Sequence, residues 1–514
     1  ARPGRELVFL LLFTGALYLT FLGHSPLAMS EGHRAIPAWE MMESGDWLVP
    51  TLFGQPYLRK PPGIQWFIAA ASAIFGSTEF AARSVSALSV VAGAGLSWFF
   101  ARRWFGDSNY GRGCARAAGY LFALAPLFWY PGRSAEIEAL HNTCALVSLL
   151  LTIDLFLGPA GAARSRWFAA GGLAIALVLT GIVKGPAAIP CILAALVASV
   201  VVTRRWRTLR NLPFWTAVLV AALTLGGFAL AIRARAASLD LAPVTQSPAG
   251  FLWDLNKWTA IVLLPLSSLA SALPGSLLLP WSLRRTPVAP TQARTPATVP
   301  PKAPSTTDIH APLIAKTLTL TVLLALVIYT ILGVSNNRYA MPALTLVPIA
   351  ASYAFRGFAE ARAVHNARWV RLGRRALLHR AAIPAFGLTI ATIVHHAWLE
   401  SRRDRISGYR TGEALANALP ENATLIANQM IEYRPETFLY AQRWAMREGS
   451  ALTIRWIPPH VSPPDRPYFA ALRQFPDPAV KTSEFEVAAA ADPDRHTVFR
   501  SLVHRFEIEV VVLD

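Results

Sequence analysis

The sequence has little charge for its length. Asp, Glu, Lys and Arg make up 15% of its 514 residues, whereas soluble domains carry about 25%. Hydrophobic residues make up 54% and gather in long runs, such as residues 7–23, 186–202 and 313–332. Runs of about 18 or more apolar residues are long enough to cross a bilayer as helices. The composition therefore excludes an ordinary soluble domain and predicts a membrane protein with many crossings.

Cysteine is also scarce. The chain has three cysteines, which all lie in or beside apolar runs: Cys114, Cys144 and Cys191. They have neither metal-ligand spacing nor an obvious disulfide pairing, so they are interpreted as small core residues. The histidines likewise form no convincing metal-binding pattern. No cofactor is therefore predicted as required, and a divalent metal stays an open alternative.

Acidic residues are too few to balance the basic ones, and the net charge is +18. Arginines cluster in short segments between the apolar runs, at residues 102–116, 164–166, 204–210, 284–285 and 356–380. Such clusters are typical of cytoplasmic loops. No basic stripe interleaved with aromatic residues suggests a nucleic-acid partner. The pattern predicts a multi-pass protein of the inner (plasma) membrane, with a cytoplasmic N-terminus and a periplasmic C-terminal part.

If the basic loops are placed on the cytoplasmic side, the apolar runs give about eleven membrane spans. They are 7–23, 80–101, 114–131, 138–157, 167–183, 186–202, 213–232, 258–281, 314–333, 339–355 and 380–398. The segment Pro61–Gly76 is apolar but short, and it is interpreted as re-entrant or interfacial. Leu7–Gly23 has the basic flank of a signal peptide, but no A-x-A site follows it, which favours a retained first helix.

Two parts are expected. Residues 1–399 form the membrane part, with an outer loop at 24–79 and a Pro- and Thr-rich cytoplasmic loop at 284–313. Residues 400–514 lose the apolar runs and form a small extracytoplasmic α/β domain. Helices are predicted there at 411–419 and 436–444, and strands at 423–428, 452–457 and 508–513. Within the outer loop, residues 35–43 predict a short surface helix, with Pro37 near its start and Gly45 beyond its end.

Six charged residues fall at the outer membrane surface under this topology: Glu31, Lys60, Glu136, Glu138, Lys184 and Arg338. Charge beside hydrocarbon is costly, so it usually has a function. A carboxylate can accept a proton from an acceptor hydroxyl, and cations stabilise charge on a departing phosphate. Glu136 and Glu138 are two residues apart and face different sides of a helix, so only Glu138 is expected in the cavity.

Three motifs of the outer loop carry a family resemblance. They are Ser30-Glu31-Gly32-His33-Arg34, Glu43-Ser44-Gly45-Asp46-Trp47-Leu48-Val49-Pro50 and Gln55-Pro56-Tyr57-Leu58-Arg59-Lys60-Pro61-Pro62. The loop resembles the first outer loop of the aminoarabinose (lipid A) transferase family, which belongs with the protein O-mannosyltransferases to the GT-C class. Two later motifs, Val183–Pro186 and Asn337–Pro342, resemble further family motifs in the right order.

The resemblance implies an all-α, GT-C-like membrane fold of 11–13 transmembrane helices followed by the small α/β domain. It also implies a glycosyltransferase whose donor is a sugar on polyprenyl phosphate, with a lipid, glycan or protein acceptor among the membrane lipids of the cell envelope. Glu31 matches the family's acidic motif, Lys60 its phosphate-side lysine, and Glu138 is the candidate second acid. Ser30 stands at the usual aspartate, and Arg59 at a usual glutamate. The second departure weakens the expectation of a metal and of an aminoarabinose donor.

The predicted site therefore has Glu31 and Glu138 as catalytic residues. The expected substrate-binding residues are Lys60, Tyr57, Lys184 and Arg338. Simpler interpretations are that the lysines and arginine anchor helix ends and that Tyr57 belongs to the interfacial aromatic belt. A transporter or flippase is the main alternative function, but its ionisable groups should lie near mid-membrane. A non-catalytic relative is the third alternative, because of Ser30.

Overall fold

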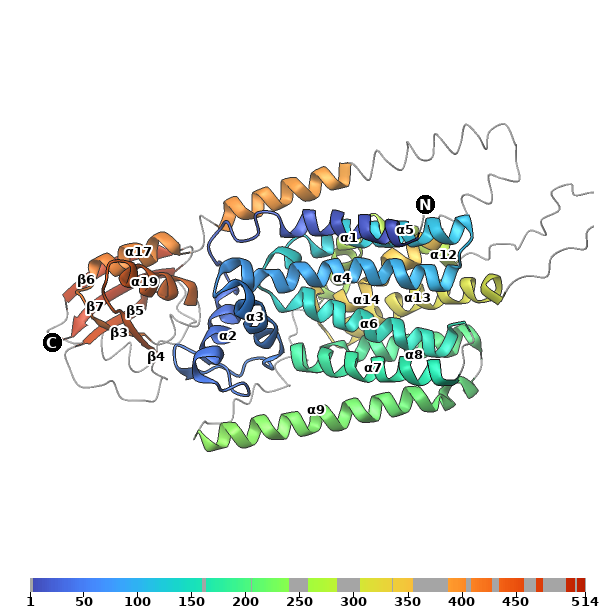
Figure 1. Ribbon diagram of the computed structural model, residues 1–514, viewed down its shortest axis with the longest axis horizontal. Coiled ribbons are helices and arrows are strands. Elements are labelled where there is room, and N and C mark those ends of the chain that lie inside the picture. The colour runs from blue at the N-terminus through green and yellow to red at the C-terminus, as the bar shows by residue number, and fades with distance from the viewer. Residues whose placement is uncertain are drawn as a thin grey trace, which may run out of the picture.

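The structure is a computed structural model. It describes residues 3–159, 163–204, 206–239, 258–283, 306–334, 336–354, 387–403, 408–427, 434–456, 468–474, 496–503 and 506–513. Figure 1 shows three parts in a row: a helical bundle, a small layer with α2 (Gly32–Ser44) and α3 (Gly63–Phe75), and a C-terminal α/β part. The end of the bundle beside α2 and α3 is called the loop end below, and the opposite end the far end.

The described helices of the bundle are α1 (Pro3–Leu19), α4 (Glu79–Phe105), α5 (Asn109–Leu124), α6 (Ile137–Leu157), α7 (Ala163–Lys184), α8 (Ile189–Thr203), α9 (Leu212–Ser238), α11 (Trp258–Ser271), α12 (Leu279–Leu283), α13 (Thr306–Ile331) and α14 (Met341–Leu344). Residues 387–403 are also helical. Within the described residues, five helical stretches are long and apolar enough to cross a membrane. The expectation of a multi-pass membrane fold is confirmed.

Helix α4 shows how local sequence sets a span. Thr78 caps its start, where its hydroxyl accepts a hydrogen bond from the amide of Ala81. Gly106 ends it with a φ of 81°, a backbone conformation that glycine adopts without steric cost. The 27 residues between these ends rise about 40 Å at 1.5 Å per residue, which exceeds the hydrocarbon thickness of a bilayer.

The chain reverses between α7 and α8. Lys184 at the end of α7 lies 3.4 Å from Glu138 at the start of α6, whereas Asn211, after α8, binds the carbonyl of Leu155 at the end of α6. The two helices therefore run between opposite ends of the bundle in opposite directions. The turn is made at Gly185, whose φ is 67°. The break between the predicted spans 167–183 and 186–202 is therefore confirmed.

Helix α3 stays at the loop end and does not cross the bundle. A Cβ on Gly63, at its start, would meet the backbone of Ile182 near the end of α7. Phe75, at its end, contacts Phe80 at the start of α4, with ring centroids 5.2 Å apart. Since both ends of α3 lie against loop-end residues, Pro61–Gly76 does not form a crossing of the bundle, which agrees with its interpretation as re-entrant or interfacial.

Two predicted spans are interrupted. The span at 258–281 is not one helix: α11 ends at Ser271 and is followed by a turn, a 3-10 segment and the short α12. Pro274 lies at this break. Proline lacks the backbone N–H that would continue the helix, so it disfavours an uninterrupted span here. The span at 114–131 ends early, since α5 stops at Leu124 before Pro126. The predicted loop at 284–313 lies outside the described residues up to residue 305, and α13 already begins at Thr306.

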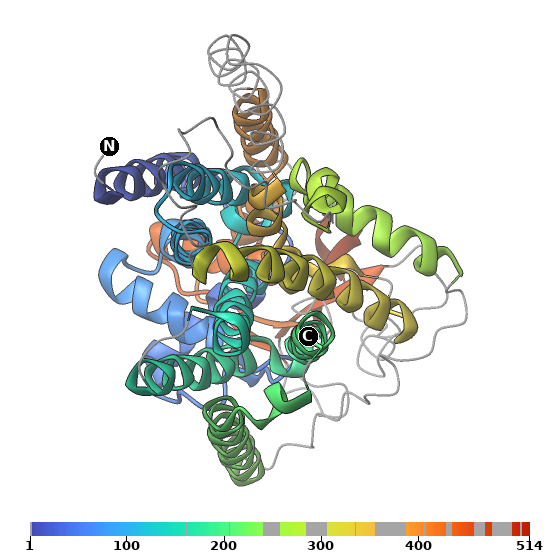
Figure 2. The same cartoon turned by 90° about the vertical axis from the view of Figure 1, so that its right-hand side faces the viewer.

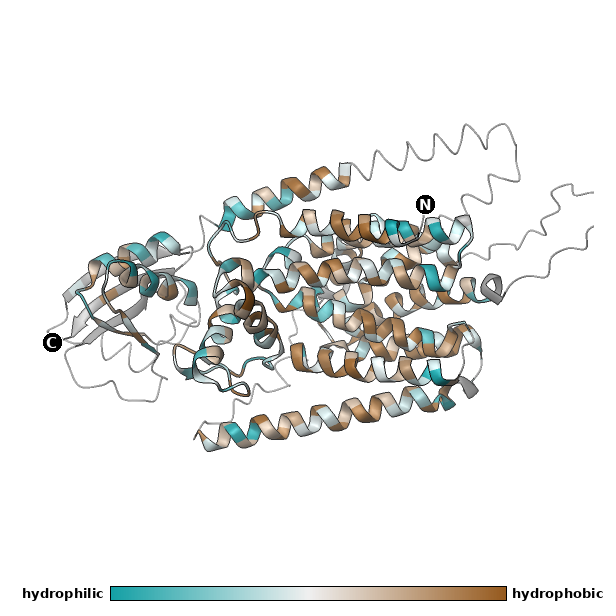
Figure 3. Cartoon of the chain, viewed as in Figure 1, coloured by the Kyte–Doolittle hydropathy of each residue, from teal (hydrophilic) through white to brown (hydrophobic). Residues whose placement is uncertain are grey.

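The bundle has one large apolar core, to which α1, α4, α5, α6, α8, α13 and residues 339–353 contribute. Helix α9 lies at the periphery, and only 11% of its apolar stretch of 18 residues is buried within the protein. Figure 2 shows it at the edge of the bundle seen end-on. Apolar residues cover the bundle helices in Figure 3, whereas polar residues are frequent in α17 (Tyr409–Ala418) and α19 (Pro435–Arg447). Exposed apolar helix faces are what a lipid environment requires.

The C-terminal part is an α/β unit, as predicted. Its sheet has the order β4-β3-β5-β7-β6, with β3 at Thr424–Ala427, β4 at Thr453–Trp456, β5 at Tyr468–Gln474, β6 at His496–Val503 and β7 at Phe506–Leu513. The pairs of β3 with β4 and β5 are parallel, and those of β7 with β5 and β6 are antiparallel. Strands β5 and β6 were not predicted. The division of the chain at residue 399 stays a prediction.

Candidate functional site

Charged side chains from three separate segments meet at the loop end of the bundle. Glu138, in the first turn of α6, lies 3.4 Å from the Lys184 Nζ and 3.8 Å from an Arg338 guanidinium nitrogen. Lys184 also lies over the ring of Tyr339, 5.1 Å from its centroid. Glu138 and Lys184 are both buried, while the Arg338 side chain is 52% exposed. The structure thus brings together three of the predicted site residues, from α6, from the α7–α8 turn and from the segment before α14.

Lys60 and Arg34 add two further cations from the outer loop. Burial and the neighbouring cations Lys184 and Arg34 lower the pKa of Lys60, while Glu138 opposes this effect. The Nε and Nη1 atoms of Arg34 are buried, with no hydrogen-bond partner among the described residues. Arg34 was not predicted as a site residue. The signal available in the sequence was its position three residues after Glu31, which places both side chains on neighbouring turns of a helix.

A second carboxylate, that of Glu136, belongs to the same group of charges. The hydroxyl of Ser30 donates a hydrogen bond to its Oε1 atom. Burial and the carboxylate of Glu138 raise the pKa of Glu136 to about 7, and Arg34 and Arg338 oppose this effect. The prediction that only Glu138 faces the cavity is therefore too narrow. Glu136 precedes the first residue of α6, so helical spacing does not govern its direction.

These side chains are called the charged cluster below. They are Arg34, Lys60, Glu136, Glu138, Lys184 and Arg338. The cluster holds four cations and two carboxylates, so its formal charge is +2. Protonation of Glu136 would raise that value further. A site with such an excess of positive charge is suited to bind a phosphate group.

Glu31 lies next to Ser30 in the chain, but its carboxylate is occupied elsewhere. It accepts two hydrogen bonds of 2.8 Å from Arg83, and further bonds of 2.9 Å from the amides of Ala28 and Ala135. Arg403 lies 3.4 Å away. Burial would raise the pKa of Glu31, but Arg403 and Arg83 lower it to about 2. So acidic a carboxyl group is a weak proton acceptor, which disfavours the predicted role of Glu31 as base.

The Glu31–Arg83 pair belongs to a buried network at the loop end. Arg403 contacts Glu400 at 3.0 Å, and Glu400 contacts Arg133 at 3.1 Å. The network joins the first outer loop, α4, the segment before α6 and the helical residues 387–403. It was not predicted, because its partners are far apart in the sequence. The only local signal was Arg83 itself, a charge four residues inside an apolar span.

Tyr57 lies in an apolar layer between the outer loop and the C-terminal part. Its ring stacks on His33, with centroids 5.6 Å apart, and it belongs to a buried cluster that includes Phe53 and Phe438. Its side chain is 5% exposed. This environment indicates a packing role for Tyr57, and its predicted contact with substrate remains a prediction.

Helix α19 docks on the same loop. The amide of Leu27 donates to the Tyr440 hydroxyl at 2.6 Å, and this hydroxyl donates to Glu79 at 3.1 Å. Arg443 donates to Glu79 at 2.8 Å and lies over the ring of Trp39. The C-terminal part is thus held against the segments that carry Ser30 and Glu31.

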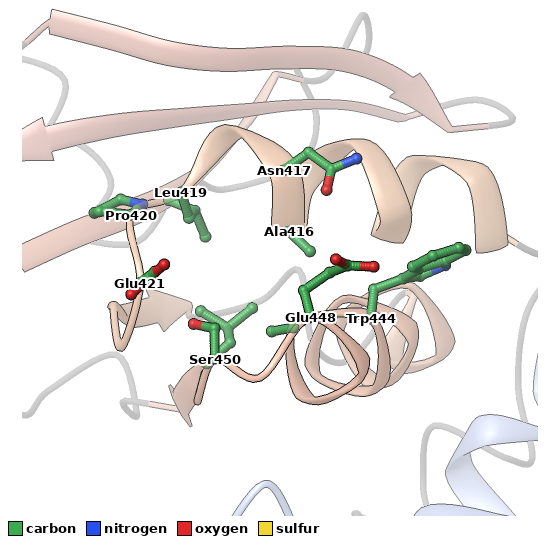
Figure 4. Close-up of a pocket in the computed structure, with 10 residues that line it drawn as sticks. Ala416, Asn417, Leu419, Pro420, Glu421, Trp444, Glu448 and Ser450 are labelled. Atoms are coloured by element: carbon green, nitrogen blue, oxygen red, sulfur yellow. The ribbon is translucent and has the colours of Figure 1, made fainter.

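A pocket of about 140 Å³ lies between the C-terminal end of α19 and the end of α17 (Figure 4). Glu421, Glu448, Asn417 and Trp444 are among its lining residues, and none of the predicted site residues lines it. Among the residues that the structure describes, no group of three or more His, Cys, Asp and Glu side chains is placed to hold a metal ion.

Comparison with known proteins supports the family resemblance. Residues 59–228 match the family model for dolichyl-phosphate-mannose-protein mannosyltransferase. An undecaprenyl phosphate-alpha-4-amino-4-deoxy-L-arabinose arabinosyl transferase of Pseudomonas fluorescens is 30% identical over 184 residues, which are 35% of this chain and 30% of that protein. A protein of the same name from Aeromonas salmonicida is 38% identical over 103 residues, 19% of this chain and 17% of the relative. The matched segments thus span less than a third of these relatives' length.

Solved structures extend the likeness to nearly the whole chain. The crystal structure of ArnT from Cupriavidus metallidurans in the apo state has a TM-score of 0.71 at 18% identity, over 99% of this chain and 98% of that one. The same protein bound to undecaprenyl phosphate has a TM-score of 0.69 at 19% identity, over the same shares of both chains.

These comparisons define the class: the chain is a multi-pass membrane protein with the GT-C fold. The particular likeness is to ArnT, the aminoarabinose transferase, as the motifs of the outer loop predicted. The fold class and the resemblance are both confirmed.

Proposed function

We propose that the protein is a glycosyltransferase that moves a sugar from a polyprenyl-phosphate donor to an acceptor at the outer face of the membrane. The observation that carries this proposal is the charged cluster, with four cations around two carboxylates at one end of the bundle. A donor phosphodiester has one negative charge, and the prenyl phosphate left after transfer gains a second. The cluster's charge of +2, from four cations and two carboxylates, would neutralise the product.

Electrostatic stabilisation of the leaving group then explains the catalysis. The acceptor oxygen or nitrogen attacks the anomeric carbon, and the bond from that carbon to the phosphate oxygen breaks with its electrons remaining on the phosphate. Lys60, Lys184, Arg34 and Arg338 stabilise the charge that develops there. Glu138 orients Lys184 and Arg338, which lie 3.4 and 3.8 Å from it. Inversion at the anomeric carbon follows from a single displacement.

The comparisons support this donor class. The ArnT structure that shares the fold was obtained with undecaprenyl phosphate bound, and the curated relatives are named for a sugar carried on undecaprenyl phosphate. The acceptor class is a lipid, a glycan or a protein. Arg59, which stands where the family motif usually has glutamate, disfavours aminoarabinose as the sugar of this donor.

We further propose that the loop end faces the periplasm and that the N-terminus faces the cytoplasm, in the inner membrane. Arg102, Arg103 and Arg112 lie around the α4–α5 turn at the far end, where Arg103 pairs with Asp154 at 2.9 Å. Clustered arginines favour the cytoplasmic side. The start of α1 lies toward this end of the bundle, and the α/β part lies at the opposite end (Figure 1).

Activity on a lipid-linked sugar tests the proposal. Purified protein is incubated with a panel of sugars on undecaprenyl phosphate, and consumption of donor and formation of undecaprenyl phosphate are followed by mass spectrometry. The proposal predicts turnover of at least one donor. Movement of intact donor from one leaflet of a liposome membrane to the other, without consumption of the donor, would instead indicate a flippase. Binding of undecaprenyl phosphate without turnover of any donor would indicate a non-catalytic relative.

A further inference from the structure

We propose that Glu136 is the general base of this site, with Ser30 as the residue that positions its carboxylate. The inference rests on the proposed function, because a base is needed only if an acceptor is activated. It assigns the proton-accepting role to a residue outside the pair Glu31 and Glu138 that the sequence favoured.

Availability separates the three carboxylates at the loop end. A base must keep an oxygen lone pair that is not committed to a cation. Glu31 is held by Arg83 and Arg403, within 2.8 and 3.4 Å. Glu138 is shared by Lys184 and Arg338. Among the described residues, Glu136 has no ion pair within 4.0 Å, and its carboxylate accepts a hydrogen bond from the Ser30 hydroxyl.

The backbone around Glu136 is held in place from two sides. Its amide donates to the carbonyl of Ser134 at 2.7 Å, and its own carbonyl accepts from the hydroxyl of Ser86 on α4 at 3.2 Å. The neighbouring amide of Ala135 donates to Glu31. Glu31 therefore links the segment of Ser30 to the segment of Glu136. The network around Arg83 thus helps to position the Glu136 carboxylate beside the Ser30 hydroxyl.

The proposed step balances as follows. The ionised carboxylate of Glu136 takes the proton from the acceptor O–H or N–H while the acceptor atom bonds to the anomeric carbon. The bond between that carbon and the phosphate oxygen breaks, and the electron pair leaves with the prenyl phosphate. One negative charge on Glu136 and one on the donor become two on the product phosphate, with the proton on Glu136.

The surroundings of Glu136 give the step a defined pH dependence. The groups that face it are Glu138 on α6, Arg34 on α2, Arg338 before α14, the Ser30 hydroxyl and the phenol of Tyr130. The pKa of Glu136, raised to about 7 by burial and by Glu138, is close to the value at which a base is both ionised and able to accept a proton. Turnover should therefore fall as the pH falls below about 7.

A carboxylate swap tests the proposal. Glu136→Gln removes the base while keeping the size of the side chain, and turnover should fall by about 100- to 10,000-fold. Because the Ser30 hydroxyl contacts Glu136 directly, an acid placed at residue 30 would lie nearly where the lost carboxylate was. The double variant Ser30→Asp with Glu136→Gln should regain about tenfold or more of the lost rate. Its low-pH limb should also move, since a different carboxyl group then titrates.

Two measurements keep failure of the base separate from failure of the fold or of the function. Undecaprenyl phosphate binding, measured by native mass spectrometry, should survive in Glu136→Gln, because the cations of the cluster remain. Glu43→Gln, an exposed change on α2, is the matched control for handling. If the natural protein consumes donor and Glu136→Gln does so at a similar rate, the assignment of the base is overturned and the proposed function stands. If the natural protein consumes no donor, both fall.

Discussion

Arg83 binds Glu31 through two hydrogen bonds of 2.8 Å, from its Nε and Nη2 atoms, with both side chains almost fully buried. This bidentate pair joins the first turns of α4 to the first outer loop. The buried Glu31 carboxylate accepts four hydrogen bonds, two from Arg83 and two from backbone amides. These contacts indicate that Glu31 stabilises the fold. The chemistry is assigned instead to the charged cluster beside it.

Glu31→Gln should therefore destabilise the protein, because it leaves Arg83 and Arg403 without their common counter-charge. Breaking one side of a buried ion pair costs about 3–5 kcal/mol. Thermal unfolding in detergent, compared with Glu43→Gln on the exposed face of α2, measures the loss. An unchanged unfolding temperature for Glu31→Gln would contradict the anchoring role.

The same pair should make stability depend on pH. The pKa of Glu31 in the folded protein, about 2, lies below its ordinary 4.5. Between these values the unfolded state binds more protons, so the stability that Glu31 contributes is present above 4.5 and is lost as the pH falls toward 2. Unfolding followed by tryptophan fluorescence across this window should show the loss. Glu31→Gln should flatten that part of the curve, and an identical curve in the variant would contradict the assignment.

Removing a cation from the charged cluster should weaken donor binding. Lys184→Met keeps much of the side-chain length but deletes the charge, and the lost charge-assisted contact corresponds to about 1.5–3 kcal/mol, or roughly a 10- to 150-fold weaker affinity. Titration of undecaprenyl phosphate measures the change. Arg5→Met, an exposed cation at the start of α1, is the control and should bind normally. Equal affinities for the two variants would exclude Lys184 from the phosphate site.

The contact of α19 with Glu79 should stabilise the docking of the C-terminal part. Glu79→Gln and Arg443→Met each remove the ion pair of 2.8 Å between the two side chains, and each should lower stability by about 1–3 kcal/mol. In a double-mutant cycle the combined variant should be little worse than either single one, because both remove the same contact. Arg447→Met, an exposed change on the same helix, is the control. Strictly additive losses would contradict the coupling.

Labelling should place the two ends of the bundle on opposite sides of the membrane. Asp107, between α4 and α5, has a 76% exposed side chain, and Glu448 is exposed just after α19. An impermeant maleimide added to intact cells should label Glu448→Cys but not Asp107→Cys. The natural cysteines are buried, so their background should be low. Labelling of both positions, or of neither, would overturn the proposed topology.

The elements that the sequence predicted well are those with local signals. Gly45 marks the end of the surface helix, and the structure shows α2 at Gly32–Ser44 with Gly45 in the left-handed conformation that ends it. The start was predicted less well: α2 begins three residues before residue 35, and Pro37 lies inside the helix. Lys184, Arg338 and Glu138 were recognised because charge beside hydrocarbon is costly. Their grouping at one membrane surface followed from the predicted topology, which was assigned from the apolar runs and the positions of other arginines.

The pairings within the network around Arg83 had no such signal. Its partners Glu31 and Arg83 are 52 residues apart, and Arg133 and Glu400 are 267 apart. Pairing over such distances depends on how the helices pack, which no local pattern encodes. For the same reason the sequence could not tell which of Glu31, Glu136 and Glu138 keeps an uncommitted carboxylate. That distinction comes from the arginines that the fold places beside each one.

Donor turnover with and without two cations of the charged cluster tests the proposed function and its site together. Purified natural protein and the double variant Lys184→Met with Arg338→Met are reconstituted with a panel of sugars on undecaprenyl phosphate, and released undecaprenyl phosphate is counted. We expect turnover by the natural protein for at least one donor, and a loss of both donor binding and turnover in the variant. Equal turnover by the two proteins would contradict this expectation.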